Sequence, residues 1–148
     1  MNIAVRLLGV VLLLASALTL SQALESDDSR FVADIELQTA DEFLQLLQRA
    51  DQLLVEGVIA QDPQPRITFL LHGPVLRDLL RQSYLKNREL VDLAASLSAL
   101  QVVEIKACQT WMAGNGVNAA DLQPFIETVP FAAGEVERLL AEKHYIRF

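Results

Sequence analysis

The sequence of 148 residues contains a single cysteine, Cys108, so the chain cannot form an internal disulfide. It has two histidines, His72 and His144, and the one cysteine is too far from both in sequence to complete a metal-binding motif. Gly114 and Gly116 lack the third glycine of a dinucleotide-binding loop. The sequence also has neither a Walker loop nor a Gly-x-Ser-x-Gly motif. We therefore expect no metal, no cofactor and no serine nucleophile.

Positive charge is scarce in this chain. Its 12 lysine and arginine residues face 19 aspartate and glutamate residues, which gives a formal net charge of −7 at pH 7. Nucleic acids and anionic membrane surfaces attract proteins through clustered lysine and arginine. The charge balance therefore argues against a nucleic-acid partner and against an anionic membrane surface.

A long apolar run lies near the N-terminus. Residues 1–6 hold one positive charge, residues 7–20 (LLGVVLLLASALTL) are uncharged and mostly apolar, and Ser21-Gln22-Ala23 follows. This order is typical of a secretory signal, and the run is shorter than the ~20 residues of a membrane-spanning helix. We expect cleavage after Ala23, a periplasmic or secreted protein, and no membrane contact after cleavage. An uncleaved anchor is the alternative.

After the apolar run, residues 24–29 are expected to form a flexible leader and residues 30–148 a single domain. Apolar and polar side chains alternate over residues 31–38, as in a strand with one apolar face. Thr39 and Glu42 have the spacing of a capping box, which predicts a long amphipathic helix that continues to about residue 60. A nearly continuous apolar stretch, RITFLL, then predicts a second strand that is covered on both faces.

The rest of the chain continues this alternation. The patterns are helix, strand, short helix, strand, helix and strand, over residues 90–100, 101–107, 110–113, 125–130, 132–143 and 145–148. Such alternation predicts an α/β fold, with helices on both faces of a mostly parallel five-stranded sheet. Asp34, Glu36, Glu104 and Lys106 place charge on strands that such a sheet usually buries. We therefore expect that these strands have one hydrated face or that a partner subunit covers it.

Cys108 follows the third predicted strand directly and precedes a short helical pattern. In an open parallel sheet, ligands and reacting groups collect where strands end and helices begin. The amides at the start of a helix favour the thiolate, which is the reactive form of cysteine. Lys106 lies two positions earlier, on the same face if the strand continues, and its charge would favour the thiolate further. A structural, apolar cysteine is the alternative, because free cysteine is often buried.

Other residues flank the thiol in this interpretation. His72 ends the second predicted strand and is a candidate base for the cysteine, with a hydrogen-bonded surface histidine as the alternative. The candidate catalytic residues are therefore Cys108, Lys106 and His72. The candidate substrate-binding residues adjoin the two strand ends; they are Gly73, Gln109, Thr110 and Trp111. The sequence alone does not establish that the two strand ends are neighbours.

The last third of the sequence contains several motifs in a distinctive order. An apolar strand ends in Cys108, a short helix ends near Gly116, and a segment of Asp-Leu-x-Pro type begins at Asp121. A strand that ends in Val129-Pro130, a helix and an aromatic final strand complete the series. This order resembles that of the DsrE/DsrF-like family, and a looser resemblance extends over most of the chain after the apolar run.

The resemblance implies a three-layer α/β/α domain that assembles as a homo-oligomer, a trimer or a hexamer. For members with the cysteine it also implies a sulfur carrier, in which a thiolate accepts sulfur as a persulfide and passes it to a partner protein. Cys108 would carry the sulfur between a donor and an acceptor protein, and a sulfurtransferase activity stays open at this point. We therefore expect an exported DsrE-like protein that handles sulfur or thiols. The alternative is a non-catalytic, oligomeric binding or scaffold module with Cys108 as a buried structural residue.

Overall fold

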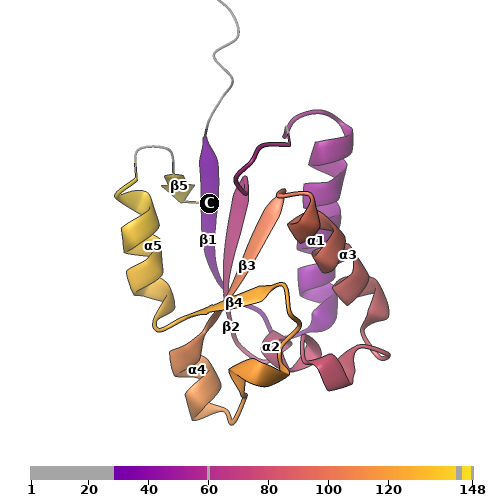
Figure 1. Cartoon of the computed structure of the whole chain (residues 1–148), viewed down its shortest axis with the longest axis vertical. Helices are drawn as coiled ribbons and strands as arrows, with labels where there is room; N and C mark the ends of the chain where they lie inside the picture. Colours follow the sequence, from indigo (N-terminus) through magenta and orange to yellow (C-terminus); the bar gives the residue numbers. More distant parts are fainter. Residues whose placement is uncertain (1–28, 60, 143–144, 148) are drawn as a thin grey trace, which may run out of the picture.

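A computed structural model of the chain describes residues 29–59, 61–142 and 145–147. These residues form a five-stranded sheet with helices on both faces (Figure 1). The strands are β1 (Arg30–Glu36), β2 (Ile67–His72), β3 (Val103–Cys108), β4 (Ile126–Val129) and β5 (Tyr145–Arg147). They lie in the order β4-β3-β2-β1-β5, and the pairings between these neighbours are parallel. The predicted α/β class and five-stranded parallel sheet are confirmed, whereas the predicted signal peptide and His144 lie outside the described residues.

The helices divide between the two faces of the sheet. They are α1 (Ala40–Val55), α2 (Val75–Asp78), α3 (Arg88–Ala99), α4 (Gln109–Gly114) and α5 (Ala132–Leu140), with short 3-10 turns at Arg81–Ser83 and Ala119–Asp121. Helices α1 and α3 pack together on one face, while α5 lies on the other face beside β1 (Figure 1). Within the part of the chain that the structure describes, no helix is long and apolar enough to cross a membrane.

Helix α1 begins as the sequence predicts and ends earlier. The Glu42 amide donates to Thr39 Oγ1 at 3.3 Å, and the Thr39 amide donates to Glu42 Oε2 at 3.2 Å, which confirms the capping box. The helix ends at Val55, so the predicted continuation to residue 60 is wrong. Gly57 adopts a φ of +71°, a left-handed conformation that commonly terminates helices.

Two apolar cores lie on the two faces of the sheet, because successive side chains of a strand point to opposite faces. The larger core lies under α1, α2 and α3 and includes Phe43, Phe69 and Ile105. The smaller core lies under α5 and includes Leu70 and Cys108. The thiol therefore belongs to the α5 face of the sheet.

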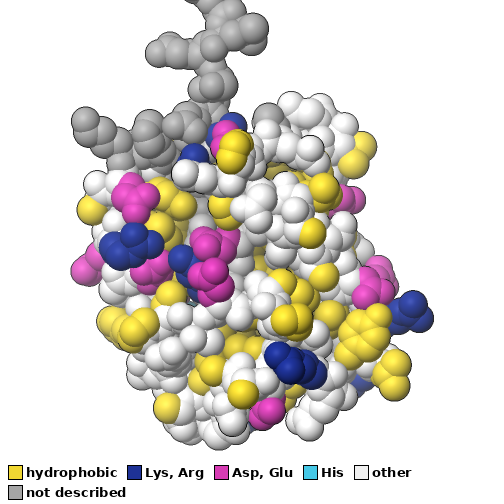
Figure 2. Space-filling view, viewed as in Figure 1, with side chains coloured by type: hydrophobic (Ala, Val, Ile, Leu, Met, Phe, Trp, Pro, Cys, Tyr) yellow, Lys and Arg dark blue, Asp and Glu magenta, His cyan; other side chains and the backbone are white. Residues whose placement is uncertain are grey.

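The α5 face is only partly apolar. Asp34 and Glu36 of β1 are exposed, and Glu104 of β3 keeps 24% of its side chain exposed. Lys106 lies on the same strand face and is 8% exposed. Figure 2 shows acidic and basic side chains gathered in the middle of the viewed surface, over the sheet beside α5. Within one chain this strand face is therefore polar and partly open, as expected both for a hydrated face and for a face that a partner subunit covers.

Candidate functional site

Cys108 is the last residue of β3 and the residue that precedes the first turn of α4. Its side chain is 5% exposed and packs in the apolar cluster under α5. Val129 lies beside it on β4 in the parallel register, and Ala132 at the start of α5 belongs to the same cluster. The thiol is therefore at the carboxyl edge of the sheet, and it is covered in this conformation.

His72 and Cys108 end neighbouring strands. The register of β2 and β3 pairs Leu71 with Ala107, so the next residues on each strand, His72 and Cys108, come side by side on the α5 face. Strands in a sheet are ~4.8 Å apart, which brings the two backbones into proximity. The imidazole Nε2 of His72 lies 3.1 Å from Oδ1 of Asp34, so this ring nitrogen contacts β1.

Lys106 lies within an ion-pair network. Its Nζ atom is 2.9 Å from Glu135 Oε1 on α5 and 3.4 Å from Glu104 Oε2 on β3. Burial alone would lower the pKa of Lys106, but the hydrogen bond with Glu135 and the nearby charge of Glu104 outweigh burial and raise it. The ammonium thus stays charged and is held by two carboxylates. That the charge of Lys106 favours the thiolate of Cys108 stays a prediction.

Glu135 is the centre of this network. The guanidinium of Arg138 donates to both carboxylate oxygens of Glu135 at 2.8 Å. These bonds lower the pKa of Glu135 from 4.5 to about 2; burial opposes the shift, and the hydrogen bond from Lys106 adds to it. The carboxylate therefore stays ionised and connects α5 to β3.

Two hydrogen bonds tie α4 to the neighbouring strand end. Gln109 Nε2 donates to Thr128 Oγ1 at 2.8 Å, and Thr110 Oγ1 donates to the carbonyl oxygen of Pro130 at 2.8 Å. Both bonds reach the β4–α5 segment next to the thiol. They connect α4 to the segment that contributes Val129 and Ala132 to the cluster around Cys108.

The remaining predicted binding residues have structural contacts. Gly73 adopts a φ of +102°, and a Cβ atom there would lie 2.7 Å from the carbonyl oxygen of Leu37. Trp111 is half-buried, and the guanidinium carbon of Arg77 lies 5.8 Å from its ring centroid, a distance that allows a cation–π contact. Gly73 thus permits a close approach of two backbone segments, and Trp111 packs against Arg77.

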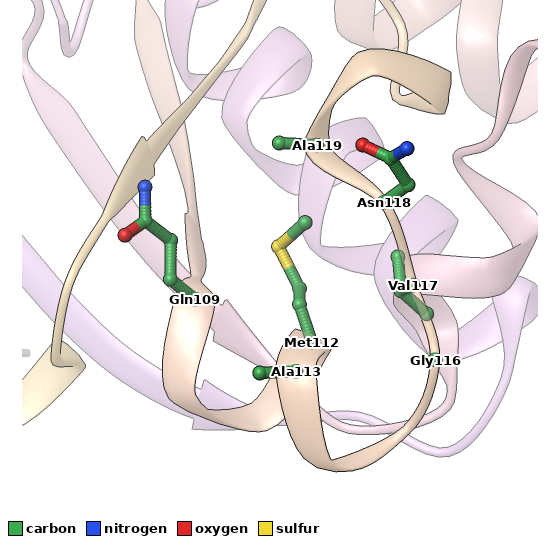
Figure 3. Close-up of a pocket in the computed structure, with 7 residues that line it drawn as sticks. All are labelled: Gln109, Met112, Ala113, Gly116, Val117, Asn118 and Ala119. Atoms are coloured by element: carbon green, nitrogen blue, oxygen red, sulfur yellow. The ribbon is translucent and has the colours of Figure 1, made fainter.

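A shallow pocket of about 380 Å³ lies beside α4 (Figure 3). Gln109, Met112 and Ala113 form one side, and residues 116–119 form the other. In Figure 3 the Met112 side chain lies between Gln109 and this loop. Because Gln109 directly follows Cys108, the pocket adjoins the chain segment that carries the thiol. Among the described residues, no group of three or more His, Cys, Asp or Glu side chains could hold a metal ion.

The sequence did not reveal the partners of the predicted site residues. Asp34 contacts His72, and Glu135 contacts Lys106. Period-two alternation could have placed Asp34 and His72 on one face of neighbouring strands. Glu135 gave no such signal, because only the packing of α5 against the sheet brings it to Lys106.

Two solved structures are similar in fold to this chain. MTH1491, a protein of unknown function from Methanobacterium thermoautotrophicum, is 22% identical with a TM-score of 0.59; the match covers 81% of this chain and 99% of that chain. The ychN protein from E. coli is 16% identical with a TM-score of 0.56, over 81% of this chain and 99% of that chain. At these identities the likeness shows that the chain shares its fold with both proteins. No family model and no curated protein sequence matches the chain.

Proposed function

We propose that this protein is an exported, DsrE-like sulfur carrier in which Cys108 accepts sulfur as a persulfide and passes it to a second thiol. The observation that carries the proposal is the position of the thiol at the carboxyl edge of a parallel sheet, beside the strand end that holds His72. Reacting groups of open parallel sheets collect at this edge. The similarity to DsrE/DsrF-like structures supports the same assignment through the fold alone.

The proposed reaction is a thiol exchange. The thiolate of Cys108 attacks the outer sulfur of a donor persulfide, R–S–SH. A sulfur–sulfur bond forms on Cys108 as the donor's sulfur–sulfur bond breaks, giving Cys108–S–SH and the leaving thiolate R–S⁻. The sulfur moves together with its proton, so no oxidant or reductant is required. An acceptor thiolate then attacks the outer sulfur and restores the Cys108 thiolate.

His72 and Lys106 have different roles in this proposal. His72 is the base that receives the thiol proton, and its contact with Asp34 orients the ring. Lys106 is a positioning residue, because two carboxylates bind its ammonium and one of them belongs to α5. It holds α5 against the sheet beside the thiol.

Sulfur transfer requires a local opening, because Cys108 is 5% exposed. The bonds from Gln109 and Thr110 to the β4–α5 segment close this region and are the contacts that must break. The same burial favours the second candidate function, a binding or scaffold module that assembles as a homo-oligomer. In that case Cys108 is a small apolar side chain packed with Val129 and Ala132.

Intact-mass analysis after exposure to a persulfide donor tests the proposal. The wild-type protein should gain the mass of one sulfur atom, and a reductant should remove it. Cys108→Ser is the matched control and should gain nothing. A folded wild-type protein that gains no sulfur contradicts the carrier function and favours the scaffold.

Export is tested separately, by determining the N-terminal residue of the protein recovered from cells. The proposal rests on the apolar run and on the small residues that follow it, and it expects mature chains that begin at Leu24. Chains that retain residues 1–23 and stay in the membrane fraction would instead establish the uncleaved anchor.

A further inference from the structure

A second cavity lies at the opposite end of the sheet from Cys108. It has a volume of about 260 Å³ and lies between α1 and the first residues of β1 and β2. Phe31, the second residue of β1, and Ile67, the first residue of β2, pair with each other and contribute to its wall. Cys108 ends its own parallel strand, so the cavity and the proposed sulfur site occupy opposite edges of the sheet.

Among the residues of α1 that line the cavity, Ala50 is the small one. Leu46, Arg49, Ala50 and Leu53 line it, and their spacing places them on one side of the helix. Ala50 is 2% exposed and lies between larger neighbours on this inner surface. A leucine at the same position would extend into the space that the alanine leaves.

The walls of the cavity are fixed by contacts of their own. The ring of Phe69 meets the ring of Phe43 edge to face, with centroids 5.6 Å apart. Val58 and Ile59 close another side, and their amides donate to the carbonyl oxygen of Leu53 at 2.9 and 3.2 Å. The pocket is therefore formed before any ligand binds, which is typical of small-molecule sites.

Among the described residues that line this apolar pocket, one has a charged side chain. Arg49 is exposed, and its Nη1 donates to Oε1 of Gln52, a neutral amide, at 2.9 Å. Arg49 forms no ion pair with any residue that the structure describes. Its positive charge is thus available to an anion at the edge of the cavity.

We propose that this pocket binds a small amphipathic carboxylate. The apolar body of the ligand lies between α1 and the start of β1 and β2, and the carboxylate pairs with Arg49. The volume of about 260 Å³ lies below the ~300–1,000 Å³ of pockets for drug-sized ligands, so the occupant is a medium-chain acid rather than a larger molecule. The site is independent of the proposed sulfur chemistry.

Calorimetric titration with octanoate, 1-octanol and octylamine tests the inference. Octanoate should bind the wild-type protein most tightly, because it satisfies both the apolar cavity and the cation. Arg49→Gln should weaken octanoate binding about two- to fivefold, as expected for an exposed ion pair, and leave 1-octanol binding unchanged. Arg88→Gln removes an exposed arginine from α3, outside the pocket lining, and should change neither affinity.

A second pair of variants uses Val58, which lines the pocket and is 69% exposed, so substitution there should leave folding intact. Val58→Glu should weaken octanoate binding and Val58→Lys should strengthen it, with little effect on 1-octanol. Ala50→Leu should weaken binding of both probes by filling the cavity. The inference is overturned if the wild-type protein binds no octanoate, which is the result expected if another part of the chain fills the pocket. The inference is also overturned if the affinity for octanoate is the same in the wild type, in Arg49→Gln and in both Val58 variants.

Discussion

The Nζ atom of Lys106 lies 2.9 Å from Oε1 of Glu135, and this contact joins β3 to the first turn of α5. Arg138, one turn further along α5, binds the same carboxylate at 2.8 Å. Ala132 and Val136 of α5 pack in the cluster that buries Cys108. Helix α5, which covers the thiol, is therefore held to the sheet by the Lys106–Glu135 ion pair and by the apolar cluster beside it.

Replacement of Glu135 by glutamine should destabilise the protein. The change removes one of two carboxylates from an ammonium that is 8% exposed, and we expect a loss of roughly 1–3 kcal/mol in the free energy of unfolding. Urea unfolding measures it. Glu142→Gln removes the outer partner of Arg138, which is exposed, and should cost less than about 1 kcal/mol. Equal losses in the two variants would contradict a central role for Glu135.

The contribution of Glu135 should depend on pH in a defined direction. Its pKa is lowered from 4.5 to about 2 by Arg138, against burial and with Lys106, so folding favours its ionised form. The resulting stability is fully present above pH 4.5 and is lost as the pH falls towards 2. Unfolding free energies of wild type and Glu135→Gln, measured across this range, should converge as the pH falls. A difference that is constant with pH would be inconsistent with the lowered pKa.

Gly73→Ala should be strongly destabilising. The φ of +102° is unfavourable for alanine, and the new Cβ atom would lie 2.7 Å from the backbone oxygen of Leu37. We expect a loss of at least about 1–3 kcal/mol, measured by thermal or urea unfolding. Gly114→Ala is the matched control, because a Cβ atom there has no heavy atom within 4 Å and φ is not positive. Its effect should be small, and a similar loss in both variants would contradict the assigned strain.

Thr110→Val should make Cys108 more reactive. The variant keeps the shape of the side chain and removes the hydrogen bond to Pro130, which is 2.8 Å long. If opening of this region limits access, loss of a bond worth about 1 kcal/mol should raise the alkylation rate of Cys108 about fivefold. Tyr84→Phe removes the hydrogen bond that the Tyr84 hydroxyl donates to Asp92 of α3, outside the thiol region, and should leave the rate unchanged. Equal rates in wild type and Thr110→Val would show that this bond does not control access.

Local features of the fold could be predicted from the sequence. The alternation of strand and helix patterns predicts the parallel sheet. The Thr39–Glu42 capping box lies where expected, because it depends only on residues that are close in sequence. The end of α1 was placed too late, because the apolar pattern continues through Val58 and Ile59 although Gly57 has already turned the chain. These residues instead close the apolar pocket.

The arrangement of the candidate site required the tertiary structure. The proximity of His72 and Cys108 follows from the pairing of β2 with β3, and strand order is not encoded in any local pattern. The contact between Lys106 and Glu135 spans 29 residues and requires α5 to lie on the same face as the thiol. The sequence identified Cys108 as a candidate but left open whether it is buried. Its 5% exposure results from packing with side chains of other strands and of α5.

Cyanolysis of the persulfide-treated protein tests the carrier function most directly. Cyanide attacks the outer sulfur of a protein persulfide and releases thiocyanate, while the protein returns to the thiolate. We predict that folded wild-type protein releases one thiocyanate per chain, that it can be loaded again, and that Cys108→Ser releases none. Thiocyanate release from the folded wild type that does not exceed that of Cys108→Ser would contradict the assignment of Cys108 as a sulfur-carrying residue.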